Sequence, residues 1–283
     1  SVYRPDDAGF VNTLIEASKA ENQDKLYLIC FDEMNLARVE HYFSQFLSIL
    51  EMPEQNRFLK LYAKEYETRL YNVDKYPSSV KIGNNLRFIG TVNMDESTFH
   101  FSDKVLDRAN VIQLDLVPYT EWRVGDGKKA EPEQTEPGQT ENEVWSYKKY
   151  GELVKELDLE KDILSARERE FLWKVHTTLN GCSKTLGVGP RILKQIAKYL
   201  INLPKTESEE AISRKEGFDI QFVQRVLTKV RGQKEQLYDI FDENVKTSLP
   251  KLFEEYSDVS DFEKSKKMLE VKKREIENYG YTL

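Results

Sequence analysis

The sequence predicts an α/β domain built around a parallel sheet, followed by an α-helical domain. Short apolar stretches alternate with helical patterns in residues 1–120, which is typical of strands joined by helices. A segment rich in Gly, Pro, Glu, Gln and Thr then interrupts the chain, and we expect a linker or surface loop at residues 121–144. Over residues 145–283 the apolar residues recur with helical spacing, which predicts the second domain.

The first predicted strand is residues 26–31, LYLICF, which are continuously apolar. A short run of this kind indicates a strand buried on both faces of a parallel sheet. Asp32 and Glu33 follow it as an acidic turn, and the residues after the turn predict an amphipathic helix. The apolar stripe of that helix consists of Leu36, Val39, Phe43, Phe46, Leu47 and Leu50.

Two more strands and an inserted hairpin complete the predicted sheet domain. Residues 86–92, LRFIGTV, predict the second strand, and residues 111–116, VIQLDL, predict the third. A short helix is expected between them at SDKVLDRA. Apolar and polar residues alternate between positions 58 and 82, which predicts a β-hairpin over about residues 55–85.

The second half of the chain predicts helices around residues 147–157, 166–179, 191–201, 220–230 and 262–278. The last of these carries a basic run, EKSKKMLEVKKREIE. Such a run could contact nucleic acid, but it fits a solvated helix face better.

Composition narrows the class of protein. The chain has 283 residues, a formal net charge of −7, two cysteines and three histidines. No apolar run approaches the ~20 residues of a membrane helix, and the first residues lack the pattern of a secretion signal, so we expect a cytoplasmic protein with no membrane segment. The cysteines are too few for a disulfide framework, and the histidines lack metal-ligand spacing. The negative charge disfavours a surface that binds nucleic acid throughout.

The acidic turn is the first candidate site. In open α/β sheets ligands bind beyond the carboxyl ends of the strands, which is where Asp32 and Glu33 are expected. One interpretation is a magnesium–nucleotide site, in which Asp32 holds Mg²⁺ through water and Glu33 orients the attacking water. The alternative is that the pair caps the following helix, because acidic residues favour a helix N-terminus.

Three further residues favour the nucleotide interpretation. Asn93 follows the second strand at the same sheet edge, Arg108 precedes the third strand, and Arg191 lies in the first turn of a helix that begins at Pro190. An arginine without a nearby carboxylate in the sequence suggests an anion as its target. Taken singly, these residues also fit a turn residue, a surface ion pair and a solvated side chain.

In this order the residues resemble those of the AAA+ nucleoside triphosphatases. Asp32 and Glu33 resemble the Walker B pair, Asn93 resembles sensor 1, Arg108 resembles the arginine finger, and Arg191, in GPR, resembles sensor 2. Within that superfamily four segments resemble the McrB group, the motor subunits of modification-dependent restriction systems. They are FDEMNLARVEHYFSQFLSILE, NLRFIGTVNMDEST, LDRANVIQLDLVP and FDIQFVQRVLTKVRG.

The resemblance implies an AAA+ type sheet domain followed by a helical lid domain. It implies hydrolysis of ATP or GTP with Mg²⁺, with Asp32 near the ion, Glu33 polarising the water, and Arg191 and Glu96 in contact with the nucleotide. The implied partners are copies of the chain in a ring, expected to be a hexamer, and a nuclease subunit of McrC type. DNA would be contacted through the pore or indirectly.

Two features depart from this pattern. McrB-type proteins carry Met-Asn-x-x-Asp-Arg at sensor 1, whereas this chain has Glu96 in place of the aspartate and Ser97 in place of the arginine. The 283 residues also contain no G-x-x-x-x-G-K-[ST] phosphate loop, since GDGKK and GCSKT both lack required positions. We therefore expect the chain to be a downstream portion of a longer protein. The N-terminal part of its sheet domain would be missing, and the place beside the first strand would be filled by an upstream segment or another copy's strand.

Two other classes of function remain open. One is a regulatory module that binds nucleotide to assemble a ring without turnover, although such a module could dispense with Glu33. The other is a DNA-recognition module. The inserted hairpin supports this last alternative, because it carries Arg57, Lys60, Lys64 and Arg69, which could face a central pore.

Overall fold

The computed structural model describes residues 9–70, 72–93, 99–114, 146–155, 163–204 and 211–282, and these divide into two compact units. The first unit comprises Ser1–His100 and Gln113–Leu153, and the second comprises Phe101–Ile112 and Val154–Leu283. Phe101–Ile112 therefore groups with the second unit, whereas the sequence placed these residues in the first domain. The expected linker at 121–144 lies outside the described residues.

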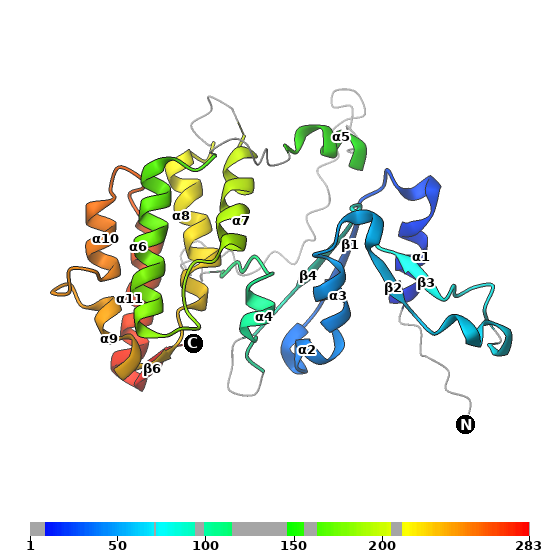
Figure 1. Cartoon of the computed structure of the whole chain (residues 1–283), viewed down its shortest axis with the longest axis horizontal. Helices are drawn as coiled ribbons and strands as arrows, with labels where there is room; N and C mark the ends of the chain where they lie inside the picture. The colour runs from blue at the N-terminus through cyan, green and yellow to red at the C-terminus, as the bar shows by residue number, and fades with distance from the viewer. Residues whose placement is uncertain are drawn as a thin grey trace, which may run out of the picture. The chain divides into compact units, whose positions relative to one another are not determined.

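A parallel pair of strands forms the centre of the first unit (Figure 1). Strand β1 (Tyr27–Phe31) pairs with β4 (Leu86–Gly90), from Tyr27 opposite Leu86 to Phe31 opposite Gly90. The prediction that the first two strands share a parallel sheet is confirmed. Among the described residues each of these strands has one neighbour, so the other edge of β1 is unpaired there.

The expectation that the first strand is buried on both faces is wrong for the described residues. On one face Phe31 and Phe88 contact the ring of Phe43, with centroids 5.5 and 5.4 Å apart. On the other face Leu28 and Ile89 are 59% and 48% exposed. The aromatic side chains of α1 (Phe10–Ser18) and of the helical segment after the acidic turn contact the Phe31 side. The guanidinium of Arg87, which lies opposite Leu28 in the pairing, is 5.8 Å from the ring centroid of Tyr147.

The helix expected after the acidic turn is divided into short pieces. It begins as η2 (Met34–Leu36) and continues as α2 (Val39–Tyr42) and α3 (Ser44–Ile49), with a break at Phe43. Of the predicted apolar stripe, Val39, Phe43, Phe46 and Leu47 are buried and Leu50 is partly buried, but Leu36 is 62% exposed. Two further 3₁₀ turns in this unit are η1 (Ala20–Asn22) and η3 (Glu54–Asn56).

The inserted hairpin is confirmed, whereas the third strand is not. Strands β2 (Phe58–Lys60) and β3 (Ser79–Lys81) pair antiparallel, with η4 (Lys64–Arg69) between them. Residues 111–114 form no strand, and Leu114 is 88% exposed. Apolar residues alone do not make a strand, because the backbone needs a neighbouring strand to bond with. Residues 115–116 lie outside the described part.

The second unit is built from helices. It contains α4 (Asp103–Leu106), α6 (Ala166–Cys182), α7 (Pro190–Ile201), α8 (Arg214–Arg225), η5 (Leu227–Lys229), α9 (Lys234–Phe241), α10 (Leu249–Glu255) and α11 (Glu263–Tyr279). Strands β5 (Gly232–Gln233) and β6 (Tyr281–Thr282) pair antiparallel. Helix α5 (Tyr147–Leu153) groups with the first unit. Most of these helices agree with the prediction from the sequence, but α9 and α10 were not predicted, and α8 begins at Arg214, before the predicted start at residue 220.

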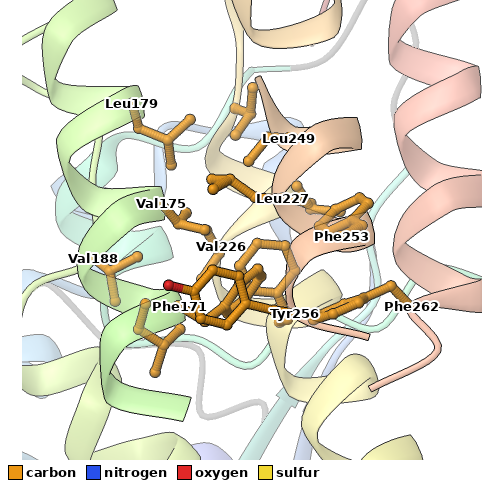
Figure 2. Close-up of a cluster of buried hydrophobic side chains, with 14 of the residues drawn as sticks. Phe171, Val175, Leu179, Val188, Val226, Leu227, Leu249, Phe253, Tyr256 and Phe262 are labelled. Atoms are coloured by element: carbon orange, nitrogen blue, oxygen red, sulfur yellow. The ribbon is translucent and has the colours of Figure 1, made fainter. Parts of the chain in front are cut away.

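Aromatic rings fill the core of the helical unit (Figure 2). Phe171 of α6 lies 4.8 Å from Phe262, between centroids, and Phe262 stacks on Phe253 of α10 at 4.7 Å. All three side chains are at most 1% exposed. Aromatic pairs at such distances stabilise a core beyond the area that they bury, so these contacts fasten α6, α10 and the start of α11 together.

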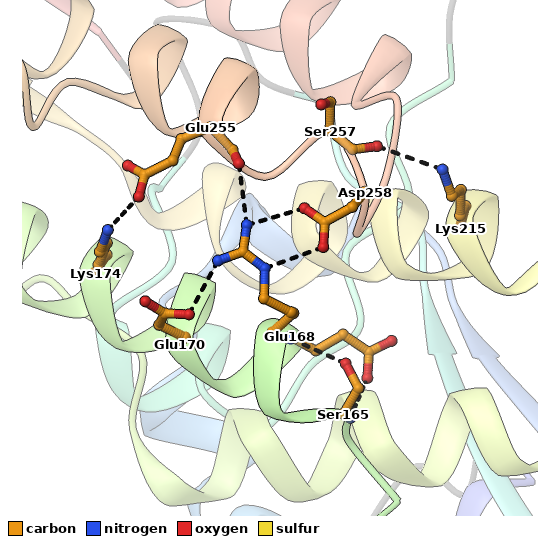
Figure 3. A network of polar contacts seen from close by, with 9 residues as sticks. Ser165, Glu168, Glu170, Lys174, Lys215, Glu255, Ser257 and Asp258 are labelled. Carbon is orange, nitrogen blue, oxygen red and sulfur yellow. Dashed lines mark hydrogen bonds and ion pairs between the residues drawn. The ribbon is translucent and has the colours of Figure 1, made fainter.

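A polar network covers one side of this core (Figure 3). The Arg167 guanidinium donates to both carboxylate oxygens of Asp258 at 3.0 Å and to Glu170 at 3.1 Å. Lys174 pairs with Glu255 at 2.5 Å. These pairs are partly exposed, so each contributes little on its own, and their main effect is to fix α6 against the segment after α10.

Candidate functional site

The acidic turn is fastened to the end of the neighbouring strand by one threonine. Thr91 follows β4, and its hydroxyl donates to Asp32 Oδ1 at 2.5 Å and accepts from the backbone N–H of Glu33 at 2.9 Å. The Thr91 carbonyl also accepts from the backbone N–H of Met34 at 2.9 Å. Parallel pairing of β1 with β4 makes these bonds possible, because it brings the carboxyl ends of both strands to one sheet edge.

A buried asparagine makes the second connection. Asn35 is 1% exposed, and its Nδ2 donates to the backbone carbonyl of Asn93 at 2.8 Å. The backbone carbonyl of Asn35 accepts a hydrogen bond from the backbone N–H of Phe99 at 3.0 Å. The turn after β1 is thus bonded to the chain on both sides of residues 94–98. The structure therefore brings Asp32, Glu33 and the Asn93 backbone to one place.

The backbone of Glu33 adopts an unusual conformation. Its φ of 49° and ψ of 47° lie in the left-handed region, which few residues other than glycine adopt. The bonds from Thr91 to both sides of this residue hold the turn there. Non-glycine residues kept in such conformations cluster at functional sites, which is a reason to examine this turn.

The interpretation of the acidic pair as a helix cap is not supported by the geometry. Glu33 precedes η2 but makes no side-chain capping bond, and the following helix α2 begins after Arg38. The Asp32 carboxylate bonds to Thr91 instead. Both acidic side chains are exposed at the sheet edge, so they can meet a ligand from solvent.

The donor set at this edge fits a magnesium ion that keeps its water. No cluster of three or more His, Cys, Asp or Glu side chains suited to a metal occurs among the described residues. Mg²⁺ does not require such a cluster, because it is commonly held by one or two carboxylates together with waters and phosphates. Asp32 is the carboxylate that would contribute here, and Thr91 fixes its orientation.

The two predicted arginines belong to the second unit. Arg108 follows α4, and its Nη1 donates to the carbonyl of Lys104 at 2.7 Å. Arg191 is the second residue of α7, after Pro190, and its side chain is exposed. Glu96, the sixth predicted site residue, lies outside the described residues, as does Ser97.

Sequence reasoning missed two residues that build this site. Thr91 and Asn35 make the bonds that place the acidic turn, yet neither was assigned a role. Asn35 lies in FDEMNLARVEHYFSQFLSILE and Thr91 in NLRFIGTVNMDEST, two of the four segments that carry the resemblance. The sequence signal that could have identified them is that both are polar residues two positions from a candidate site residue, Glu33 or Asn93.

Part of the chain matches a known protein family. Residues 141–281 match a domain of unknown function (DUF8727), a range that runs from before α5 to β6. No curated protein and no solved structure matches the chain. Within the described residues, every helix is too short or too polar to cross a lipid bilayer.

Proposed function

We propose that the chain is part of a nucleoside triphosphate hydrolysing motor of the AAA+ class, similar to McrB. The observation that carries this proposal is the pairing of β1 with β4, which sets Asp32 and Glu33 beside Thr91 and Asn93 at one sheet edge. An exposed carboxylate pair at that edge suits a nucleotide site better than a structural role.

The chemistry would be divided between the two carboxylates. Asp32, oriented by Thr91, would hold a Mg²⁺ ion through water, and the ion would neutralise charge on the phosphates. Glu33 would orient and polarise the attacking water, and its fixed backbone conformation limits where the carboxylate can reach. Either ATP or GTP is compatible with these groups, since none of them reads the base.

The proposal also needs parts that the 283 residues do not contain. They have no phosphate-loop motif, so that loop would come from a segment outside them. We propose further that copies of the protein form a ring, expected to be a hexamer, and that the ring drives a nuclease subunit of McrC type on DNA. The resemblance described above is the support for these partners.

The test is Glu33→Gln in the protein that includes the phosphate loop. Glutamine keeps the shape of the side chain but cannot polarise water, so we expect hydrolysis to fall about 10²-fold or more while nucleotide binding is nearly unchanged. The measurements are steady-state phosphate release and nucleotide affinity. Glu21→Gln, at an exposed position of η1, is the matched control and should keep the parent rate.

Turnover of Glu33→Gln within tenfold of the parent would contradict the assignment of Glu33. Phosphate release by the parent protein distinguishes the hydrolytic proposal from the alternative of a regulatory module. If the parent protein binds nucleotide and assembles but releases no phosphate, the chain acts as an assembly switch and the hydrolytic proposal is wrong.

A further inference from the structure

Three cations hold the segment that carries Arg108. They lie between the last residue of α8, Arg225, and the start of β5, and each contacts a different point of residues 101–109. Arg231 pairs with Asp103 at 2.6 Å and also donates to the carbonyl of Phe101. Lys229 pairs with Asp107. These contacts all lie within the second unit.

The third cation, Arg225, is bonded by neutral groups. Its Nε donates to Gln221 Oε1 at 2.8 Å, and its Nη1 donates to Gln195 Oε1 at 2.8 Å and to the carbonyl of Ala109 at 3.2 Å. Burial lowers the pKa of this guanidinium, yet an arginine stays charged at neutral pH. Among the described residues no carboxylate pairs with this partly buried charge, which is costly to bury, so its bond to the carbonyl of Ala109, next to Arg108, requires an explanation.

The segment itself is too short to hold its own position. Helix α4 has four residues, and isolated helices of that length do not persist in water. The backbone N–H groups of Asp107, Arg108 and Ala109 bond to carbonyls of Asp103 and Val105, within this same segment. Burial of Val105 and Leu106 and the three cations therefore determine where the segment lies.

We propose that Arg225, Lys229 and Arg231 are positioning residues for Arg108. They fix both ends of the turn from which the Arg108 side chain projects, so that the guanidinium reaches an anionic group in one defined geometry. This inference rests on the proposed function for the role of Arg108. The clamp itself, defined as these three cations on residues 101–109, rests on the contacts alone.

The first test measures the clamp without reference to activity. In Lys229→Met, which keeps most of the stem and removes the charge, we expect the amides of residues 105–109 to exchange with deuterium at least tenfold faster. Lys174→Met is the matched control, because it removes a lysine from the ion pair with Glu255 in the same unit. The control should leave exchange of residues 105–109 within twofold of the parent.

The second test measures the effect on turnover in the protein with its phosphate loop. We expect Lys229→Met to lower kcat at least tenfold with KM and melting temperature nearly unchanged, because the finger acts in the reaction and not in binding. The exchanged pair Lys229→Asp with Asp107→Lys should restore at least part of the lost kcat. Lys174→Met should keep the parent kcat.

The outcomes separate the two proposals. If exchange of residues 105–109 is unchanged in Lys229→Met, the clamp is refuted whatever the activity shows. If exchange accelerates but kcat stays at the parent value, the clamp exists and does not position a catalytic group. If the parent protein hydrolyses no nucleotide, the proposed function fails while the exchange result still decides the clamp.

Discussion

Thr91 places the acidic turn because its side chain and backbone bond to three successive residues. Its hydroxyl bonds to Asp32 and to the Glu33 N–H, and its carbonyl bonds to Met34. Gly90, just before it, packs so closely that an added Cβ would lie 2.5 Å from the sulfur of Met34. Glycine at the end of β4 therefore lets the Met34 side chain pack against the strand, and the threonine after it supplies the hydroxyl.

Lys272 is a buried charge of the helical unit and gives a prediction for pH. Burial lowers its pKa to about 8, Glu275 opposes that shift, and Arg231 adds to it. The Lys272 ammonium donates a hydrogen bond to Thr282 Oγ1 at 3.5 Å. Between pH 8 and the usual lysine value of about 10.4, the unfolded chain binds more protons than the native chain.

The free energy of unfolding should therefore rise with pH across that window. We expect the rise to be larger in the parent than in Lys272→Met by about 2–3 kcal/mol. Below pH 8 the native state carries the full cost of the buried charge, so the two curves should run parallel there. Urea unfolding at several pH values measures this difference, and parallel curves up to pH 10 would contradict the assigned pKa.

At the scale of elements, the sequence predicted those helices and strands whose formation depends mainly on residues close to one another in the chain. The strand at Tyr27–Phe31, the strand at Leu86–Gly90 and the short helix at Asp103–Leu106 follow from their own sequences. Helices α9 and α10 were missed because they are short, and because contacts with distant residues, such as that of Phe253 with Phe262, stabilise them.

The candidate site shows the same limit. The acidic turn was identified from a local pattern, since two carboxylates after an apolar run stand out in the sequence. The hydrogen bonds that place this turn join Thr91 to Glu33 and Asp32, which precede it by 58 and 59 positions. A periodic pattern in the sequence does not identify pairs so far apart. The prediction of a third strand at residues 111–116 was wrong for a related reason, because a strand depends on a partner strand elsewhere in the chain.

The exposed face of the sheet gives a prediction about cysteine reactivity. Cys30 lies on that face and is exposed, whereas Cys182 is half-buried and burial raises the pKa of its thiol. Thiolate is the reactive form, so Cys30 should react with a maleimide about tenfold faster or more in the 283-residue chain. Mass spectrometry of partly labelled protein gives both rates, and Cys30→Ser isolates the rate of Cys182.

The same reaction tests whether a segment outside these residues covers the exposed face of the sheet in the longer protein. If a strand or helix from outside these residues covers Leu28, Cys30 and Ile89, labelling of Cys30 should slow in the longer protein or the assembly. Unchanged labelling in an assembled ring would mean that this face stays open. Equal rates for the two cysteines in the 283-residue chain would instead contradict the exposure of Cys30.

At the scale of the whole molecule, the candidate residues are shared between two units. Asp32, Glu33 and Asn93 belong to the first unit, and Arg108 and Arg191 to the second. An arginine finger acts on the site of a neighbouring subunit, so the proposal does not require Arg108 to reach Asp32 of its own chain. The decisive prediction about Arg108 therefore concerns an assembly of several copies.

Arg108→Ala should reduce turnover about 10³-fold or more, because an arginine finger stabilises charge that develops on the transferred phosphate. Mixing it with Glu33→Gln subunits should restore activity. In an equal random mixture about a quarter of the head-to-tail interfaces would join an intact Glu33 to an intact Arg108. Phosphate release at several mixing ratios measures this recovery. The control mixes Arg108→Ala with the double variant that carries both Glu33→Gln and Arg108→Ala. No subunit of this mixture has an intact Arg108, so it should stay inactive. If no ratio restores activity although both variants enter the ring, Arg108 does not act between subunits, and its contact with Lys104 has only a structural role.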